Sequence, residues 1–450
     1  MCEMKDSGIE WIGEIPKDWE FPKITHVLDY THPYPIGDGD HGTIKAENYS
    51  EEGIPFIRVQ NLGFATELIM NNLVYITEKQ NNGIINSTLY PNDILFAKTG
   101  ATIGKVGIMP ENIKKANTTS HVGKITVSEE AVPKFIFYVL SSFIGYKQFW
   151  DIALMKSTRP ELSIDEIKTL HVLLPKTLVE QQQIVDYLDT KCSAIDATAE
   201  DIQKEISLLE DYKKSVITEA VTKGLNPDAE MKDSGIKWIG EIPKDWEVLR
   251  FDYLLYERTE KNSPIITDER LALSIDKGIT LYSEKTTNLD RFKEDVSQYK
   301  IAYVGDFVMN MIVGAVDVSP YFGCVSPAYY VFYDDNAEHY ICRFCNYLFH
   351  TPVLKKVLYS LGKGIMAIDR GDGKVNTCRL KVSRYDLAKL KIPVPINREI
   401  IKIVDFLDTK CSAIDTLIAD KKRQLDILAD YKKSLIYEYV TGKKEVPVNE

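Results

Sequence analysis

Two neighbouring stretches of the sequence gather side chains that suit the phosphates of nucleic acid. "AKTGATIGK" (97–105) and "KKANTTSHVGK" (114–124) carry lysines, hydroxyls and a histidine: Lys98, Thr99, Lys105, Lys114, Lys115, Thr118, Thr119, Ser120, His121 and Lys124. Lysines and hydroxyls bind phosphate oxygens and position a protein on DNA, whereas Asn, Gln, Arg or Lys in a groove read base edges. We expect this group to contact DNA. For any single residue in it, the alternative is a solvated basic face.

A second candidate lies near the end of the chain. "GKGIMAIDRGDGKVNTCR" (362–379) reads as a Gly-rich basic loop that carries Lys363, Arg370, Lys374, Asn376 and Arg379. Glycine lets a backbone approach a ligand closely. We expect the two lysines to contact phosphates and Arg370 to read a base, because arginine pairs with guanine through two hydrogen bonds.

Motifs for enzymatic chemistry are incomplete. "TGATIGKVG" (99–107) has three residues between Gly100 and Gly104 and a valine after Lys105. A phosphate-binding loop needs four residues between its glycines and then Lys followed by Ser or Thr. The sequence also lacks the Asn-Pro-Pro-Tyr or Asp-Pro-Pro-Tyr motif of amino methyltransferases. We therefore expect a chain without catalytic residues and without a cofactor.

Two further groups of residues resemble metal ligands. Cys342 and Cys345 form one CxxC in a predicted helix, where core packing explains them better than zinc, which needs four ligands. "GDGDHG" (37–42) predicts a tight turn; a metal site and a loop close to DNA are the alternatives. We expect no bound metal.

Charge is segregated along the chain. The net charge of −11 argues against nucleic acid only if it is spread evenly, but residues 355–391 are net +7 and residues 91–124 are net +3. Residues 185–212 are net −6. Attraction to phosphate depends on such local patches. The sequence has no apolar run of about 18 residues and no signal peptide, and its seven cysteines suit a reducing compartment. We expect a cytoplasmic protein without a membrane segment.

The chain repeats itself around two unlike blocks. "MKDSGIEWIGEIPKDWE" (4–20) returns at 231–247 with one difference in seventeen positions, and "VDYLDTKCSAID" (185–196) returns at 404–415 with one in twelve. Between these repeats, residues 21–183 and 248–403 are nearly unrelated. A period above 200 residues indicates duplicated domains rather than a solenoid. We expect a shared architecture with two specificities.

The second repeat predicts long helices. Its apolar residues follow steps of three and four over more than four heptads, which is typical of a coiled coil. No Pro or Gly interrupts 184–223 or 401–441, and Gly224 and Gly442 follow as C-terminal caps. The helices should pair with each other, although each could pack on its own domain. The predicted seam comprises Leu188, Ile195, Ile202, Ile206, Leu209, Leu407, Ile414, Ile418, Leu425 and Leu428, with Lys421 as a break.

The first repeat, with two tryptophans in each copy, predicts an irregular lead-in that docks on these helices. Each block should mix strands with helices: strands within 53–62, 73–79 and 93–100 and a helix over 132–150 in the first, with a parallel series in the second. Asp93 then corresponds to Asp306, and Ser163 to Ser383.

These motifs occur twice, in the same order, and together the whole chain resembles the specificity subunit of type I restriction-modification systems, the HsdS family. The resemblance rests on "IPKDW" before each block, on "NDILFAKTGATIG" and "GDFVMNM" within them, and on "LPKTLVEQQQIVDYLDTK" and "IPVPINREIIKIVDFLDTK" where the helices start. One departure is that Gln181, Gln182 and Gln183 become Ile400, Ile401 and Lys402, which leaves the role of the glutamines open.

The resemblance implies an α+β chain with two α/β target-recognition domains, a pair of long antiparallel coiled-coil helices and a pseudo-two-fold repeat. Expected boundaries are 1–183, helix 184–224, 225–403, helix 404–442 and a tail at 443–450. Each domain would read one half of a bipartite double-stranded DNA target. The helices would set the spacer and recruit two DNA adenine methyltransferase subunits and, in the nuclease form, restriction subunits. The main rival is a coiled-coil adaptor that binds only proteins, and a second is a nucleotide-using enzyme.

Overall fold

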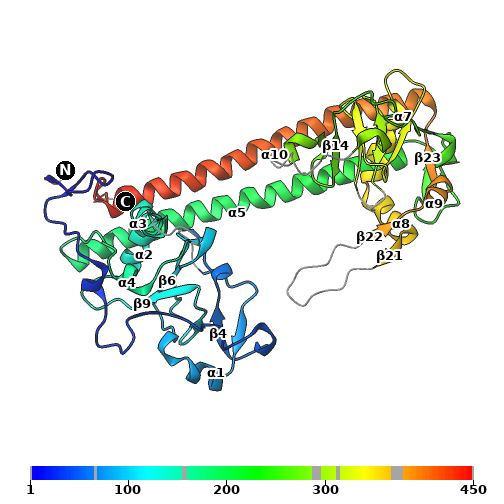
Figure 1. Ribbon diagram of the computed structural model, residues 1–450. Coiled ribbons are helices and arrows are strands. Elements are labelled where there is room, and N and C mark those ends of the chain that lie inside the picture. The colour runs from blue at the N-terminus through cyan, green and yellow to red at the C-terminus, as the bar shows by residue number, and fades with distance from the viewer. Residues whose placement is uncertain are drawn as a thin grey trace. The chain divides into compact units, whose positions relative to one another are not determined.

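The computed structural model describes residues 3–64, 68–154, 160–285, 295–310, 315–365 and 379–447 (Figure 1). The chain forms two compact units: residues 1–202 with 423–450, and residues 203–422. Each unit contains one lead-in, one variable block and part of each of two long helices. The mixture of helices and strands confirms the α+β class expected from the sequence.

The two long helices are α5 (Leu178–Lys223) and α10 (Asn397–Val440), of 46 and 44 residues. They begin six and four residues before the uninterrupted stretches that the sequence indicated, because the segments after Pro175 and Pro395 are already helical. Both end as predicted at a glycine with positive φ, Gly224 at 78° and Gly442 at 66°. Only glycine adopts that conformation without strain.

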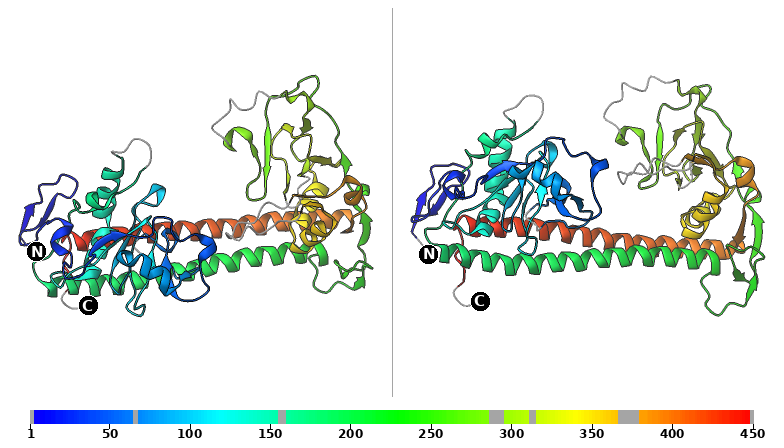
Figure 2. Two further views of the ribbon diagram at one scale, coloured as in Figure 1. Left: turned by 60° about the horizontal axis from the view of Figure 1, so that its bottom comes forward. Right: turned by 90° about the horizontal axis from the view of Figure 1, so that it is seen from below.

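In the first unit the beginning of α5 lies beside the end of α10 (Figures 1 and 2). The ring centroids of Tyr187 and Tyr439 are 4.6 Å apart. Nine residues further along α5, Asp196 accepts both contacts of the Lys432 ammonium at 2.7 Å. The residue number rises on one helix as it falls on the other, so the two segments run antiparallel.

In the second unit the end of α5 lies beside the beginning of α10. Lys421, the break in the predicted seam, forms an ion pair with Glu205, and Lys213 forms one with Asp415 at 2.7 Å. These two segments also run antiparallel. Of the predicted seam, Leu188, Ile202, Ile206, Leu407, Ile414 and Ile418 are buried, and Ile195, Leu209, Leu425 and Leu428 are half-buried.

The block of the first unit is built on two sheets. A four-stranded antiparallel sheet has the order β3-β9-β6-β7, and a three-stranded sheet has the order β5-β4-β8 with β4 and β8 parallel. The strands are β3 (Ile36–Asp38), β4 (Ile54–Ile57), β5 (Val74–Ile76), β6 (Ile94–Ala97), β7 (Val106–Ile108), β8 (Asn117–Thr118) and β9 (Val122–Ile125). The helices are α1 (Glu78–Gly83), α2 (Pro133–Ser141), α3 (Phe143–Leu154) and α4 (Ile164–Ile167).

The block of the second unit repeats the four-stranded sheet. Its order β13-β20-β17-β18 matches that of the first unit strand for strand, and all its pairs are antiparallel. Asp93 precedes β6 and Asp306 precedes β17, and Ser163 and Ser383 cap α4 and α9, as the sequence predicted. The two unlike sequences therefore share the topology of this four-stranded sheet.

Outside this sheet the second block differs from the first, because its other described strands pair two by two: β12 with β23, β14 with β15, β16 with β19 and β21 with β22. The strands are β12 (Glu247–Arg250), β13 (Tyr256–Glu257), β14 (Leu271–Ser274), β15 (Gly278–Leu281), β16 (Lys300–Ala302), β17 (Phe307–Met309), β18 (Val316–Val318), β19 (Gly323–Val325), β20 (Tyr330–Tyr333), β21 (Lys363–Ile365), β22 (Arg379–Lys381) and β23 (Lys391–Val394). The helices are α6 (Tyr282–Lys285), α7 (Tyr340–His350), α8 (Pro352–Leu361) and α9 (Arg384–Ala388).

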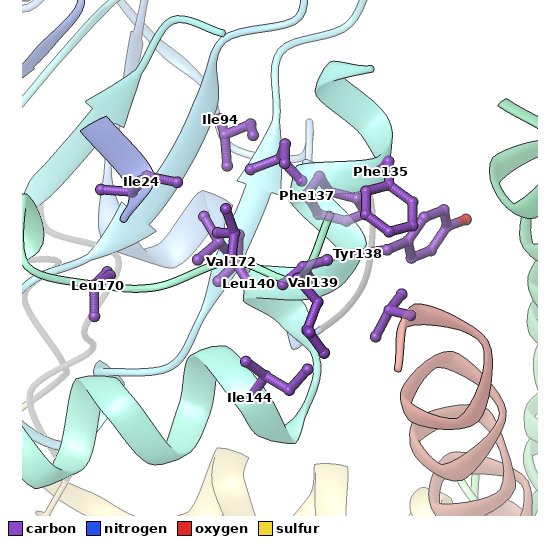
Figure 3. Packing of buried hydrophobic residues seen from close by; sticks show 14 of the residues in the cluster. Ile24, Ile94, Phe135, Phe137, Tyr138, Val139, Leu140, Ile144, Leu170 and Val172 are labelled. Carbon is purple, nitrogen blue, oxygen red and sulfur yellow. The ribbon is translucent and has the colours of Figure 1, made fainter. Parts of the chain in front are cut away.

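One hydrophobic core joins each block to the long helices. In the first unit it combines Ile24, Phe135 and Val172 of the block with Leu188 of α5 and Val440 of α10. Figure 3 shows side chains of α2 packed in this core. The second unit has the corresponding core, which includes Val221 of α5 and Leu407 of α10. Burial of this apolar surface supplies most of the stabilising free energy.

Each lead-in docks on the helices through its second tryptophan. The buried Trp19 donates from Nε1 to Glu180 at 2.9 Å, and Trp246 donates to Glu399 at 2.8 Å. The predicted docking is therefore confirmed. The lead-ins are less irregular than expected, because each begins with a ribbon of two three-residue strands: β1 (Met4–Asp6) with β2 (Glu14–Pro16), and β10 (Met231–Asp233) with β11 (Glu241–Pro243).

The glutamines at the start of α5 differ in their environment. Gln181 is buried, accepts the Val132 N–H at 2.8 Å and donates to the Pro175 carbonyl at 3.2 Å. Ile400, at the equivalent place in α10, is buried in the apolar core of its unit. Thus Gln181 ties α5 to the first block by hydrogen bonds, and the second unit uses apolar packing instead.

Candidate nucleic-acid interface

The end of the four-stranded sheet in the first unit gathers three of the predicted residues. β6 ends at Ala97 and β9 begins at Val122, so the segments beyond them lie side by side, and the Lys98 N–H donates to the His121 carbonyl at 2.9 Å. There Thr99 Oγ1 lies 3.1 Å from Nδ1 of the exposed His121. Hydroxyl and imidazole groups in this position can donate to or accept from a phosphate or a base edge.

The "GDGDHG" segment supports the same rim and forms the tight turn predicted. The Asp40 carboxylate accepts the N–H groups of Gly42, Thr43 and Ile44 at 3.0 Å. The Asp40 carbonyl accepts the Ser120 N–H at 2.9 Å. The turn therefore fixes Ser120, the neighbour of His121 in the chain, and we call Thr99, Ser120 and His121 the sheet rim.

Three predicted DNA contacts lie inside the domain, and the prediction is corrected for them. Lys98 is buried and its ammonium donates to Asp38. Thr118 is fully buried and donates to the Ile57 carbonyl at 2.9 Å. Lys124 is fully buried, with Nζ 2.7 Å from the Thr88 carbonyl and 3.7 Å from Asp93. Groups that are buried and satisfied within the fold cannot reach a phosphate without unfolding the site.

The buried pair of Lys124 and Asp93 is electrostatically strained by desolvation. Burial lowers the pKa of the Lys124 ammonium, and the charge of Asp93 opposes that shift. Burial likewise raises the pKa of Asp93, against the attraction of Lys124 and the hydrogen bond from Thr126. Such a pair is costly to break, because removing one partner leaves an uncompensated buried charge.

The remaining lysines of the first group are scattered around the rim. Lys114 is exposed. Lys115 forms an ion pair with Glu78 at 2.9 Å, and the ammonium of Lys105 lies 5.8 Å from the centre of the Phe64 ring. All three side chains are solvent-accessible, so they can contribute positive potential to this face.

The second group lies mostly outside the described residues, as Arg370, Lys374 and Asn376 do. Lys363 is exposed, and its ammonium lies 3.5 Å from the Asp386 carboxylate. The backbone of Arg379 pairs with that of Ile365, so β21 and β22 form an antiparallel ribbon.

One cation of the second unit is not among the residues that the sequence predicted. Arg258 forms two hydrogen bonds with the buried Asp306, at 2.7 and 3.0 Å, and lies between the rings of Tyr303 and Tyr333. Burial alone would lower its pKa, but the hydrogen bond and charge of Asp306 raise the pKa overall. The sequence had indicated that Asp306 corresponds in position to Asp93. A carboxylate at the same buried place needs a cation beside it, and this correspondence was the available signal for Arg258.

Among the described residues, neither of the two segments that resembled metal ligands forms a metal centre. Cys342 and Cys345 are fully buried in the core, and burial raises the pKa of both thiols. Within the described ranges no group of three or more His, Cys, Asp or Glu side chains could hold a metal ion. Among the helices of the same ranges, none has the length and apolar character to cross a membrane.

Comparison with known proteins finds one matching family and several similar proteins. The family described as type I restriction modification DNA specificity domain matches residues 16–208. The chain is 24% identical to the putative type I restriction enzyme MjaX specificity subunit of Methanocaldococcus jannaschii, over 97% of this chain and 96% of that protein. It is 27% identical to the MjaVIII specificity subunit of the same organism, over 47% of each chain.

The fold has solved counterparts. A chain from a study of complex assembly and conformational transition of the type I R-M system superposes with a TM-score of 0.62 over 96% of this chain and 99% of that one, at 13% identity. Residues 16–208 match the family of type I restriction modification DNA specificity domains, and over nearly its whole length the chain is similar to a type I restriction enzyme specificity subunit.

Proposed function

We propose that each unit reads one half of a bipartite double-stranded DNA target. The observation that carries this proposal is one four-stranded sheet topology bearing two unlike surfaces, on nearly identical lead-ins and on helices that share the repeat at 185–196 and 404–415. In such a design the segments that hold the blocks stay similar, while the DNA-reading surfaces of the two blocks differ. Residues 1–183 and 225–403 would form the two target-recognition domains, with the sheet rim and the basic segment 362–379 as the candidate contact surfaces.

We further propose that α5 and α10 form a coiled-coil spacer with an approximate two-fold axis. The repeat offset of 219 residues relates Asp196 to Asp415 and Lys213 to Lys432, and these four residues form two equivalent ion pairs. A dimeric DNA-binding protein places two readers by the same symmetry. In this proposal the helices, 184–224 and 404–442, set the distance between half-sites.

The partners would be two copies of a DNA adenine methyltransferase subunit and, in a nuclease form, restriction subunits. Each unit has a groove between its block and the long helices, of about 860 Å³ in the first and about 1140 Å³ in the second. Asp196 and Lys432 line one groove, and Asp415 and Lys213 line the other. Equivalent grooves suit one kind of subunit bound twice. The chain itself would carry no catalysis.

Block exchange tests independent reading. Residues 21–183 would be replaced by the corresponding block of another family member, and the methylated sequence would be mapped in cells that contain the methyltransferase partner. We expect one half-site to change while the other half-site and the spacer persist. A change in both half-sites would contradict independent reading.

The rival function, an adaptor that binds only proteins, predicts no DNA affinity that depends on salt. For a DNA reader, each phosphate contact that is removed should reduce the salt slope by about one unit. We expect this for Lys363→Ala and Lys374→Ala. For Arg370→Ala we expect a loss of about 1–3 kcal/mol on the target alone. Equal losses on target and random DNA would remove Arg370 from base reading.

A further inference from the structure

A polar contact connects α2 of the first block to α5. The Tyr138 hydroxyl donates to Asp189 Oδ1 at 2.6 Å, and Lys134 Nζ lies 2.8 Å from Oδ2 of the same carboxylate. Tyr138 is buried, and Figure 3 shows its hydroxyl pointing away from the apolar cluster. One carboxylate of the long helix thus binds two side chains from consecutive turns of the block.

The second unit contains the same contact. The Tyr347 hydroxyl of α7 donates to Asp408 Oδ1 at 2.5 Å, and the guanidinium of Arg343 binds the other oxygen of Asp408. In both blocks the cation stands four residues before the tyrosine, in "KFIFY" (134–138) and "RFCNY" (343–347). We call each arrangement of cation, tyrosine and aspartate a latch.

The two latches occupy equivalent places although the two blocks have nearly unrelated sequences. Asp189 and Asp408 differ by the repeat offset of 219 residues, whereas the tyrosines differ by 209 because the blocks differ in length. Burial raises the pKa of Tyr138, and the hydrogen bond to Asp189 raises it further; burial is also the main cause for Tyr347. Both hydroxyls therefore remain protonated donors. The same polar contact has persisted while most of the surrounding block sequence changed.

We propose that the latches fix the orientation of each block on the long helices and so determine which spacer length the chain accepts. Apolar packing in the shared core is strong but non-directional. A carboxylate that binds a tyrosine and a cation demands one geometry. Lys134, Tyr138, Arg343 and Tyr347 are then positioning residues that contact no DNA. This inference rests on the proposed reading of a bipartite target.

The test removes one latch and measures spacer tolerance. Lys134→Met with Tyr138→Phe keeps the volume of both side chains and removes the polar atoms. A matched control, Tyr30→Phe with Lys147→Met, makes the same changes outside the latch, at the exposed Tyr30 and at the half-buried Lys147, which is paired with Asp151. Methylation by the assembled complex would be measured on the native target and on targets with the spacer lengthened or shortened by one base pair.

We expect the latch variant to keep its half-site bases and its melting temperature within a few degrees, but to lose about fivefold or more of its preference for the native spacer. The control should retain that preference. In the second unit, Arg343→Lys recreates the cation of the first latch and should retain it, whereas Arg343→Met should not. Native spacer preference in both latch-deficient variants would overturn the inference, and so would equal loss in the control.

A second readout separates this inference from the proposed function. If the wild-type complex methylates no bipartite target, the proposed function fails, and hydrogen exchange of the isolated chain then judges the latch. Faster exchange confined to α2 and the adjoining α3 in the Lys134→Met and Tyr138→Phe variant would support a latch that holds the block. Unchanged exchange there would overturn it.

Discussion

The ammonium of Lys213 on α5 lies 2.7 Å from both carboxylate oxygens of Asp415 on α10. Lys432 and Asp196 form the same bidentate contact in the other unit, with the helices exchanging roles. The two lysines differ in burial, because the Lys432 side chain is 9% exposed and that of Lys213 is 29% exposed. Both copies of the repeat contain the ion pair, but the burial of its lysine differs between them.

This difference predicts unequal costs of truncation. Lys432→Ala removes a buried aliphatic stem together with the charge and should lower the free energy of unfolding by about 1–2 kcal/mol. Lys213→Ala should cost less than about 1 kcal/mol, as more exposed pairs do. Urea unfolding of the two variants measures both. A larger loss for Lys213→Ala would show that burial of the stem is not the cause.

The lead-in tryptophans should contribute equally to stability. Trp19→Phe and Trp246→Phe each remove a hydrogen bond to a carboxylate, with Glu180 and with Glu399, and part of a buried ring. We expect each to lower the free energy of unfolding by about 2 kcal/mol. Trp11→Phe, at a half-buried position, is the control and should cost less. Thermal or urea unfolding decides, and an unaffected Trp19→Phe variant would contradict docking by this residue.

Substitution of the buried Lys124 and substitution of the sheet-rim residues should have different effects on stability and on DNA binding. Lys124→Ala should lower stability by about 3–5 kcal/mol, because it leaves the buried Asp93 without its cation. Thr99→Ala and His121→Ala lie on the sheet rim and should leave the melting temperature within a few degrees while weakening DNA binding. Calorimetry and binding titrations on the same preparations check both statements. A Lys124→Ala variant that is stable but has lost DNA binding would show that Lys124 contacts DNA, against the conclusion drawn from its burial.

Lengthening a long helix should lengthen the spacer. Seven residues inserted after Leu209 keep the heptad phase and add about 10 Å of helix. DNA rises about 3.4 Å per base pair, so we expect a spacer longer by about one to three base pairs with both half-sites unchanged. A four-residue insertion rotates the seam and should damage assembly. An active complex that keeps its original spacing after the seven-residue insertion would show that the helices do not set the distance.

Acid should destabilise the protein through His350. Burial lowers the pKa of this imidazole, which donates to the Asn346 carbonyl at 2.8 Å when Nδ1 carries the proton. The unfolded chain therefore takes up a proton near pH 6.5, and the folded chain takes it up only at lower pH. Stability is lost as the pH falls below about 6.5, by at most about 1.4 kcal/mol per unit. His350→Asn should show a shallower fall of melting temperature between pH 7 and pH 5.5, and equal slopes would exclude His350.

Local patterns in the sequence predicted the features that local physics determines. The seam spacing gave the helices, because an amphipathic stripe must be buried, and Gly224 and Gly442 marked their ends, because a helix cap needs positive φ. The serines before α4 and α9 were recognisable for the same kind of reason. Each of these depends on residues only a few positions apart.

The candidate site was less predictable, because it depends on pairing across long distances in sequence. Lys98 and Lys124 belong to a basic run that reads as surface, yet their partners Asp38 and Asp93 stand 60 and 31 residues earlier, on or beside other strands of the same sheet. No spacing rule in one sequence reveals such a pairing. The latch residues were missed for the same reason, since Asp189 looks like any solvated carboxylate on a long helix.

The turn that precedes β6 in the first block recurs before β17 in the second. In the first block the Tyr90 N–H donates to Asp93 at 2.9 Å, and in the second the Tyr303 N–H donates to Asp306 at the same distance. The cation facing this aspartate differs in identity and in strand, with Lys124 on β9 in the first block and Arg258 beyond β13 in the second. The two blocks thus hold the same aspartate turn against different cations, so the fold accepts either a lysine or an arginine as the partner of this buried carboxylate.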